Sequence, residues 1–186
     1  LEDLPDDEAH HDLVPMLEDP TRTVRTEAAR ILARIPETLF SPEDLETFTK
    51  VFVELKLRYT SNLDRPESHL SLGILAENRN QPADAEKHYR KAVRRESTYV
   101  PARMNLATLL SRRGRSKEAE EILREAAELQ PTWGQVHYSL GLLLAEDRNR
   151  LPEAIRSLER ASAYWRDNPR VFNNLAIAYW QSDKID

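Results

Sequence analysis

One repeated pattern limits the fold more than any other feature of this chain. A leucine followed by a small residue recurs at Leu72-Gly73, Leu106-Ala107 and Leu140-Gly141. Each copy follows the previous one by 34 residues, and Leu175-Ala176 opens a fourth. Self-similarity at such a period is typical of arrays in which each small unit buries its apolar face against its neighbours.

Each unit has the pattern of two helices joined by a polar turn. Glycine is scarce (4 residues) and 32% of the residues are charged, a composition that favours helices over sheets. The small residue of the repeated dipeptide is expected to face an alanine of the second helix, so that the two helices approach closely. The expected pairs are Gly73 with Ala85, Ala107 with Ala119, and Gly141 with Ala154. The sequence therefore predicts an all-α solenoid of antiparallel helix hairpins.

The same positions resemble the tetratricopeptide repeat. That family has a Leu-Gly pair in its first helix, then alanine, an aromatic residue or leucine, and alanine in its second helix, with a closing proline. The first copy fills these positions with Leu72-Gly73, Ala85, Tyr89 and Ala92, and Pro131 closes the second copy. The predicted repeats are 66–99, 100–133, 134–168 and a partial 169–186. The resemblance implies a right-handed superhelix that binds a protein or peptide without catalysis.

The first helices of such repeats line the concave groove, so the resemblance also implies a binding face. An asparagine amide in this groove can bond the backbone of an extended or helical peptide. The groove residues implied by the family pattern are Leu70, Ile74, Asn78, Met104, Asn105, Thr108, Arg112, Tyr138, Ser139, Leu142, Asn173, Asn174 and Ile177. The basic clamp that some family members use to hold a C-terminal carboxylate is not reproduced.

Several polar residues invite a functional interpretation but favour a structural one. His69 and His137 replace the usual first-helix aromatic at equivalent places, and we expect them to have a packing role. His88 lies in the basic run KHYRKAVRR, which we interpret as a solvated outer face because no aromatic stacking platform for nucleic acid accompanies it. The carboxylate pair Glu120-Glu121 is likewise expected on a solvent face.

The first 64 residues follow a different pattern. The stretch EDPTRTVRTEAARILARIP resembles a HEAT repeat, with an Asp-Pro turn and then a helix with a Val-Arg pair and small apolar residues. A further helix, capped by Ser41 and running to about Thr60 or Leu63, is expected to bridge this unit and the repeats. The predicted organisation is a HEAT-like hairpin over 1–38, a bridging helix and linker over 39–64, and repeats over 65–186. The expected buried stripe of the HEAT-like helix is Val24, Ala28, Ile31, Leu32 and Ile35.

This order of units is also similar to the C-terminal region of predicted bacterial multihaem c-type cytochromes, in which HEAT and tetratricopeptide repeats follow the haem sites. The segments NLDRPESHLSLG and VPARMNLATLLSRRGRSKEAEEILREAAEL carry this resemblance. The chain has no cysteine, so we expect no cofactor in it, and haem only in a parent protein. The resemblance implies a partner-docking arm in the periplasm or cell envelope; without it, a cytoplasmic location is expected.

Enzymatic and metal chemistry are not indicated. No glycine-rich phosphate loop is present, and no serine or threonine has His and Asp partners at motif spacing. His10 and His11 lie in an acidic stretch, but adjacent side chains of a helix point about 100° apart, so no metal site is expected. The net charge of −8 over residues 1–64 argues against nucleic acid as a partner of the whole chain. No apolar run reaches the roughly 20 residues of a membrane span, so no membrane insertion is expected.

Self-association is the alternative to binding a separate partner. The partial fourth repeat contains Leu175, Ile177, Tyr179 and Trp180, and the sequence printed here holds no second helix to cover them. Exposed apolar residues of this kind can form a homodimer contact.

Overall fold

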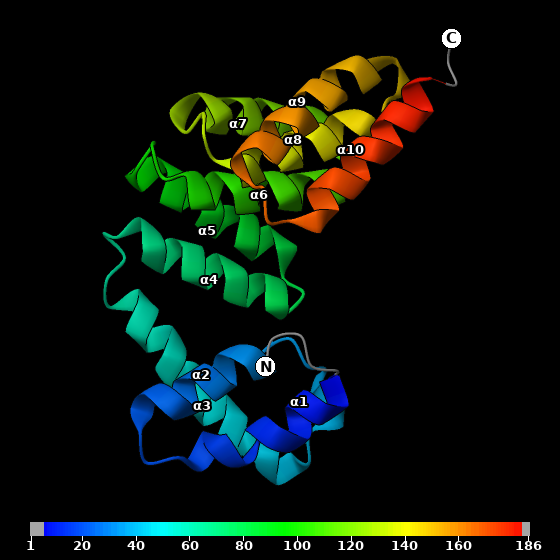
Figure 1. The fold of residues 1–186 in the computed structure, drawn as a ribbon. Coiled ribbons are helices and arrows are strands. Elements are labelled where there is room, and N and C mark those ends of the chain that lie inside the picture. The colour runs from blue at the N-terminus through cyan, green and yellow to red at the C-terminus, as the bar shows by residue number, and fades with distance from the viewer. Residues whose placement is uncertain (1–5, 184–186) are drawn as a thin grey trace. The chain divides into compact units, whose positions relative to one another are not determined.

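Helices make up all of the regular structure in residues 6–183, which are the residues that the computed structural model describes (Figure 1). The α-helices are α1 (Asp6–Leu13), α2 (Arg22–Leu32), α3 (Pro42–Thr60), α4 (Pro66–Asn78), α5 (Pro82–Arg95), α6 (Val100–Arg112), α7 (Ser116–Leu129), α8 (Gly134–Ala145), α9 (Leu151–Tyr164) and α10 (Pro169–Ser182). The short 3₁₀ helices are η1 (Pro15–Glu18), η2 (Glu37–Leu39) and η3 (Arg148–Arg150). The predicted all-α fold is confirmed.

The chain divides into two compact units, residues 1–95 and 96–186. The first unit holds α1 to α5, and the second holds α6 to α10. Paired helices dominate both: α4 packs on α5 in the first unit, and α6 on α7 and α8 on α9 in the second. In the second unit α7 also packs on α8, and α10 packs on α9, so its hairpins are stacked in chain order.

The first unit has an apolar core built mainly from α1, α2 and α3. Phe48, Val51 and Leu55 of α3 are buried in it, and Leu75 of α4 belongs to the same cluster. As a result, α3 packs against both α2 and α4.

The start and end of α3 agree with the sequence. The Ser41 hydroxyl accepts a hydrogen bond from the backbone N–H of Asp44 at 3.1 Å, and Pro42 occupies the first helical position. The helix ends at Thr60, the earlier of the two ends that the sequence left open. A side-chain acceptor satisfies one of the N–H groups that a helix start leaves unpaired, which explains why the cap could be read from the sequence.

Val24 departs from the stripe predicted for α2. The other residues of the stripe are buried, whereas Val24 keeps 37% of its surface exposed. It lies in the first turn of α2, where Arg22 and Arg25 form ion pairs with Glu54 of α3 at 2.8 and 2.9 Å. This turn is therefore attached to α3 through charged groups, so the predicted burial of Val24 is wrong.

The two glycines of the repeated dipeptide lie directly against large side chains of the second helix. A Cβ atom at Gly73 would collide with the ring of Tyr89, and a Cβ atom at Gly141 would lie 2.7 Å from Cγ of Leu158. Tyr89 and Leu158 each lie one turn after the alanine named in the prediction. The helices approach closely at these glycines, and the atoms nearest to them belong to larger side chains, which extend across the interface and fill the space that glycine leaves.

Two of the turns between paired helices reverse the chain in the same way. Asn80 and Gly114 adopt positive φ angles of 52° and 75°. After Asn80, the N–H of Gln81 donates to the carbonyl of Ala76 at 2.8 Å, and the equivalent bond after Gly114 measures 2.9 Å. These bonds form the Schellman motif, in which a left-handed residue ends the helix. In the third hairpin, which is one residue longer, η3 lies in the corresponding turn.

A buried polar residue occupies the same place in three repeats, at His69, Arg103 and His137. Arg103 donates from Nε and Nη2 to the carbonyl of Ser97, at 3.0 and 2.8 Å. Nε2 of His137 lies 2.7 Å from the carbonyl oxygen of Pro131. Each of these two carbonyls lies six residues earlier, in the loop before the helix. Arg103 and His137 hold the incoming loop, so His137 has the structural role predicted for it.

Replacing Ala119 by leucine should destabilise the second unit. Ala119 is fully buried between α6 and α7, so the added atoms would force neighbouring side chains out of favourable rotamers, at a cost of about 1–3 kcal/mol. Urea unfolding followed by circular dichroism measures this loss. Ala163→Leu, at an exposed position of α9, is the matched control and should change stability little. An unchanged midpoint in Ala119→Leu would contradict the close contact.

Candidate functional site

The groove residues implied by the repeat pattern all reach the surface. Each of them is exposed or half-buried. Those at positions 70, 74 and 78 lie on α4 in the first unit, and the others lie on α6, α8 and α10 in the second. The candidate site described below is built from the second unit alone.

A cavity of about 310 Å³ opens on the surface shared by α6 and α8. Four of the predicted groove residues line it: Thr108 and Arg112 from α6, and Ser139 and Leu142 from α8. The sequence interpretation missed the other lining residues, which are Ala107, Ser111, Leu123, Leu143 and Glu146. Ser111 and Glu146 could have been found, because they follow Thr108 and Leu142 by three and four residues and so share their helix faces.

The cavity combines apolar and polar groups. Leu142 is exposed at its edge, and the hydroxyls of Thr108 and Ser139 can donate or accept hydrogen bonds. Arg112 and Glu146 bring opposite charges to its lining. A surface of this kind can hold an apolar side chain while nearby polar groups bond to a peptide backbone.

Asn105 lies on the same face of α6 as the cavity residues. It precedes Thr108 by three residues and Arg112 by seven, the spacing of one helical stripe. Its side chain is half-buried and has no hydrogen-bond partner among the residues that the structure describes. The amide is therefore available to a ligand.

Other predicted groove residues contribute to internal packing. Met104 packs against the buried cluster of Val100, Ala126 and Val136. The Tyr138 hydroxyl accepts a hydrogen bond from Nδ2 of Asn174 at 2.8 Å. These side chains connect α8 with α10 or support the core, so only part of their surface can meet a partner. Asn173 and Ile177 of α10 are exposed.

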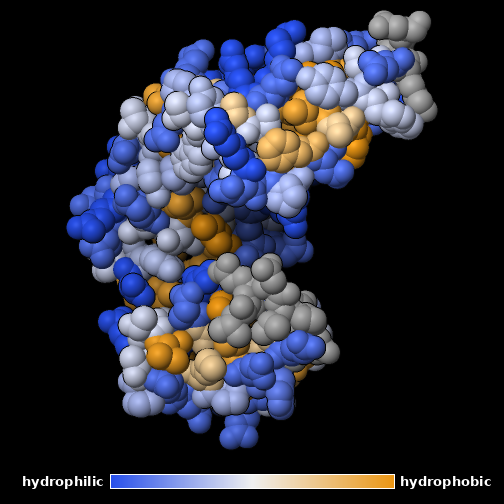
Figure 2. All heavy atoms as spheres, in the orientation of Figure 1, coloured by the Kyte–Doolittle hydropathy of each residue, from blue (hydrophilic) through white to orange (hydrophobic). Residues whose placement is uncertain are grey.

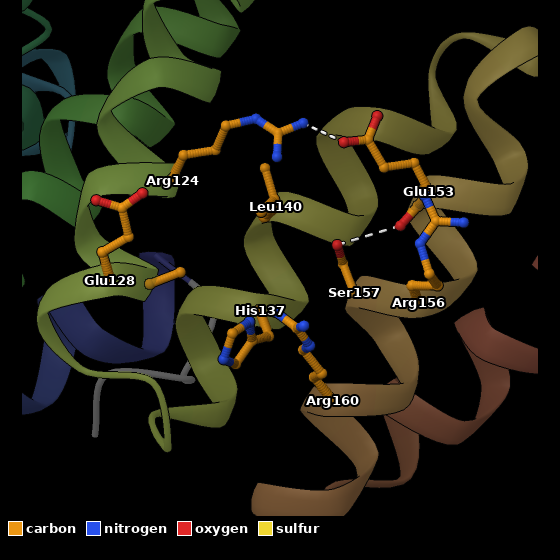
Figure 3. A pocket seen from close by; sticks show the side chains of 9 residues that line it. Arg124, Glu128, His137, Leu140, Glu153, Arg156, Ser157 and Arg160 are labelled. Atoms are coloured by element: carbon orange, nitrogen blue, oxygen red, sulfur yellow. Dashed lines mark hydrogen bonds and ion pairs between the residues drawn. The ribbon is translucent and has the colours of Figure 1, made fainter.

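A second cavity, of about 320 Å³, lies between α7, α8 and α9 (Figure 3). Its lining residues are Arg124, Ala127, Glu128, His137, Leu140, Glu153, Arg156, Ser157 and Arg160. Figure 3 shows Arg124 reaching across to the carboxylate of Glu153. Ser157 donates to the carbonyl of Glu153 at 3.2 Å, while His137 bonds the loop carbonyl described above. The hydroxyl and the imidazole are thus occupied by separate structural bonds.

A four-residue ion-pair network borders this second cavity. Glu120 accepts from Arg150 at 2.6 and 2.7 Å and from Arg124 at 2.9 Å, and Glu153 contacts both arginines. The Glu120 side chain is only 19% exposed, so its predicted place on an open solvent face is wrong. The hydrogen bonds from Arg150 have the largest effect on the pKa of Glu120 and lower it. Burial opposes them, but the hydrogen bond from Arg124 and the charges of both arginines add to the lowering, and the pKa falls to about 2. The network connects the hairpins because its members lie on α7, η3 and α9.

The two adjacent histidines near the N-terminus do not act together. His10 is half-buried, with its ring edge-on to Phe40 at 4.7 Å, while His11 is exposed. The side chains of Asp6 and Asp7 lie outside the described residues. Within the described part of the chain, no group of three or more His, Cys, Asp or Glu side chains is placed to hold a metal ion.

Stacked helix hairpins of this kind define a helical repeat protein. A family model described as "Tetratricopeptide repeat" matches residues 78–143, and a second model with the same description matches residues 135–186. Together the two matches span more than half of the chain. The chain therefore belongs to the tetratricopeptide repeat proteins. The resemblance of the sequence to the tetratricopeptide repeat is confirmed. The HEAT-like unit and the likeness to multihaem cytochromes stay predictions. No curated protein matches the chain.

Solved structures with a similar fold include two structures of MamA. The one titled "Crystal structure of MamA" is 18% identical, with 86% of each chain covered and a TM-score of 0.53. The "MamA RS-1 ArsTM double mutant" is 19% identical, with 85% of each chain covered and a TM-score of 0.59. A thermophilic TPR protein from Thermus thermophilus is 14% identical over 95% of this chain and 100% of that one, with a TM-score of 0.57. At these identities the likeness concerns the fold alone.

In the described part of the chain, no helix is long and apolar enough to cross a membrane.

Acidification should weaken the second unit through Glu120. Its pKa is about 2 when folded and about 4.5 when unpaired, so its ion pairs stabilise the fold fully above about pH 4.5 and lose this effect as the pH falls toward 2. Glu120→Gln should therefore be less stable than the wild type at pH 7, with a difference that shrinks between pH 4.5 and 2. Urea unfolding across this range measures the difference, and Glu121→Gln is the exposed control. A difference that is constant with pH would contradict this role.

Proposed function

We propose that this protein is a non-catalytic scaffold that binds a peptide segment of a partner protein on the face formed by α6 and α8. Tetratricopeptide repeats generally mediate protein–protein interactions, which sets the class of function. The observation that carries the proposal is the α6–α8 cavity, where residues implied by the groove pattern on two different helices meet. Binding a peptide there needs no catalytic group.

Each group in the cavity has a distinct role in this proposal. The Asn105 amide and the Thr108 and Ser139 hydroxyls bond the peptide backbone, which gives affinity with little dependence on sequence. Leu142 contacts an apolar side chain of the peptide. Arg112 and Glu146 favour opposite charges on the two ends of the bound segment and so select its direction.

Peptides selected from a displayed library should lose binding when this face is altered. We expect both Leu142→Glu and Asn105→Ala to weaken the binding of the selected peptides. For Asn105→Ala the loss in affinity should be about fivefold or more, since one hydrogen bond contributes about 1 kcal/mol. Both variants should keep the wild-type melting temperature, since neither side chain is fully buried. Leu129→Glu, at an exposed leucine of α7, is the control and should bind normally. Unchanged binding in both groove variants would contradict the proposal, and unfolding of Asn105→Ala would show that this amide is structural.

Self-association is a second candidate, favoured by the exposed apolar residues of α10. Phe172, Ile177 and Trp180 are 46%, 42% and 60% exposed. Figure 2 shows apolar side chains gathered at the surface near the C-terminal end of the second unit. Leu175, which was expected to be exposed, is half-buried and packs against the cluster of Ile155, Leu158 and Ala178.

Sedimentation should separate this candidate from a monomeric scaffold. If α10 mediates a homodimer, the wild type should dimerise with rising concentration and Trp180→Glu should shift it to monomer, because a charge would be buried at the contact. Leu57→Glu, at a 61% exposed position of α3, should leave the dimer intact. A monomer at all concentrations would exclude this candidate.

The likeness to multihaem cytochromes leads to a proposal about the parent protein. In that setting the chain would be a partner-docking arm, and the haem would be attached elsewhere because this chain has no cysteine. The upstream coding sequence decides the matter. Several CxxCH motifs and an export signal would support an electron-transfer setting, and their absence would exclude it.

A further inference from the structure

A cationic cavity lies in the first unit, whereas the residues proposed for peptide binding belong to the second unit. It has a volume of about 430 Å³ and is lined by Leu63, His69, Lys91, Arg94 and Arg95. The two arginines lie in the last turn of α5, with Lys91 one turn earlier, and His69 belongs to α4. The sequence interpretation took this basic run for a solvated outer face, yet the structure places three of its cations around one cavity.

The cations of this cavity have no acidic partner among the residues that the structure describes. No carboxylate lines the cavity, and Lys91, Arg94 and Arg95 form no ion pair or hydrogen bond with any residue that the structure describes. Elsewhere on α5, Arg90 is paired with Glu86 at 2.8 Å. The negative end of the α5 dipole favours cations in its last turn, but it offsets only about half of one charge. An excess of positive charge therefore remains at the cavity.

His69 adds a buried hydrogen-bonding group to the wall of the cavity. The residue is only 3% exposed, and its Nδ1 lies 3.2 Å from Nδ1 of His88. This bond fixes the ring and is its only hydrogen bond to a described residue, so Nε2 is left to meet a ligand. Burial first, and then the charges of Lys91, Arg95 and Arg94, lower the pKa of His69, which agrees with the position of these cations around the same cavity.

We propose that this cavity binds the phosphoryl group of a small phosphorylated molecule, held by Lys91, Arg94 and Arg95 against the ring of His69. A phosphate dianion can be neutralised by two or more cations, and its tetrahedral oxygens accept donors from several directions at once. Guanidinium groups bind phosphate oxygens with two parallel hydrogen bonds, and lysine adds a point charge. A planar carboxylate has one charge and two oxygens, so it would leave part of this set of donors unused. The volume lies in the range of small-molecule sites.

Titration of the intact chain with inorganic phosphate and with pyrophosphate, followed by calorimetry and by NMR of the histidine ring protons, tests the site. We expect both anions to bind, and to shift the ring signals of His69 but not those of His137. The double variant Arg94→Gln/Arg95→Gln should weaken binding by at least about tenfold, since it removes two charge-assisted contacts. Lys87→Gln/Lys117→Gln removes the same total charge at exposed positions outside the cavity and should bind within about twofold of the wild type.

Equal weakening by the two double variants would overturn the site, because it would show a response to net charge alone. Citrate is the carboxylate comparison, and citrate binding as tight as that of pyrophosphate would overturn the preference for phosphate. Vesicles containing phosphatidate distinguish a lipid headgroup from a soluble ligand. Binding to such vesicles without binding to either free anion would overturn the proposal of a small molecule. Equal melting temperatures of the variants and the wild type would show that the losses do not come from unfolding.

Discussion

Close contact between the two helices of each hairpin is the constraint on which the rest of the repeat structure depends. In the first hairpin the absence of a side chain at Gly73 leaves room for the Tyr89 ring, and in the third hairpin Gly141 does the same for Leu158. Once these faces are joined, the opposite faces of the first helices are left for solvent or for a partner. The proposed peptide site on α6 and α8 is therefore a consequence of how the hairpins close.

The polar residue that replaces the usual first-helix aromatic has two effects. Arg103 and His137 hold a carbonyl group of the preceding loop, which fixes where each first helix begins. Both His69 and His137 also line cavities. The same substitution thus provides a polar attachment within the hairpin and leaves space beside it.

Charge is used differently at the two cavities beside these histidines. Around His137, the guanidinium of Arg124 is paired with Glu120 and Glu153, and the resulting network stabilises the contact between hairpins. Around His69, the cations of α5 meet no carboxylate among the lining residues. Paired charges at a junction between hairpins stabilise the fold. Cations that lie around a cavity without a carboxylate can instead bind an anion from solution, which is the role that we propose for the cavity at His69.

The sequence by itself determined the helical class, the 34-residue period and the start of α3, because these depend on local spacing and capping along the chain. The surface position of the groove residues followed from the resemblance to the repeat family. Only the tertiary structure decided that Tyr89 faces Gly73, that Val24 stays exposed and that Glu120 enters an ion-pair network. It also decided that a basic run borders a cavity. These features depend on side chains brought together from different helices, and the length and direction of a side chain across an interface are not encoded in the periodicity of either helix.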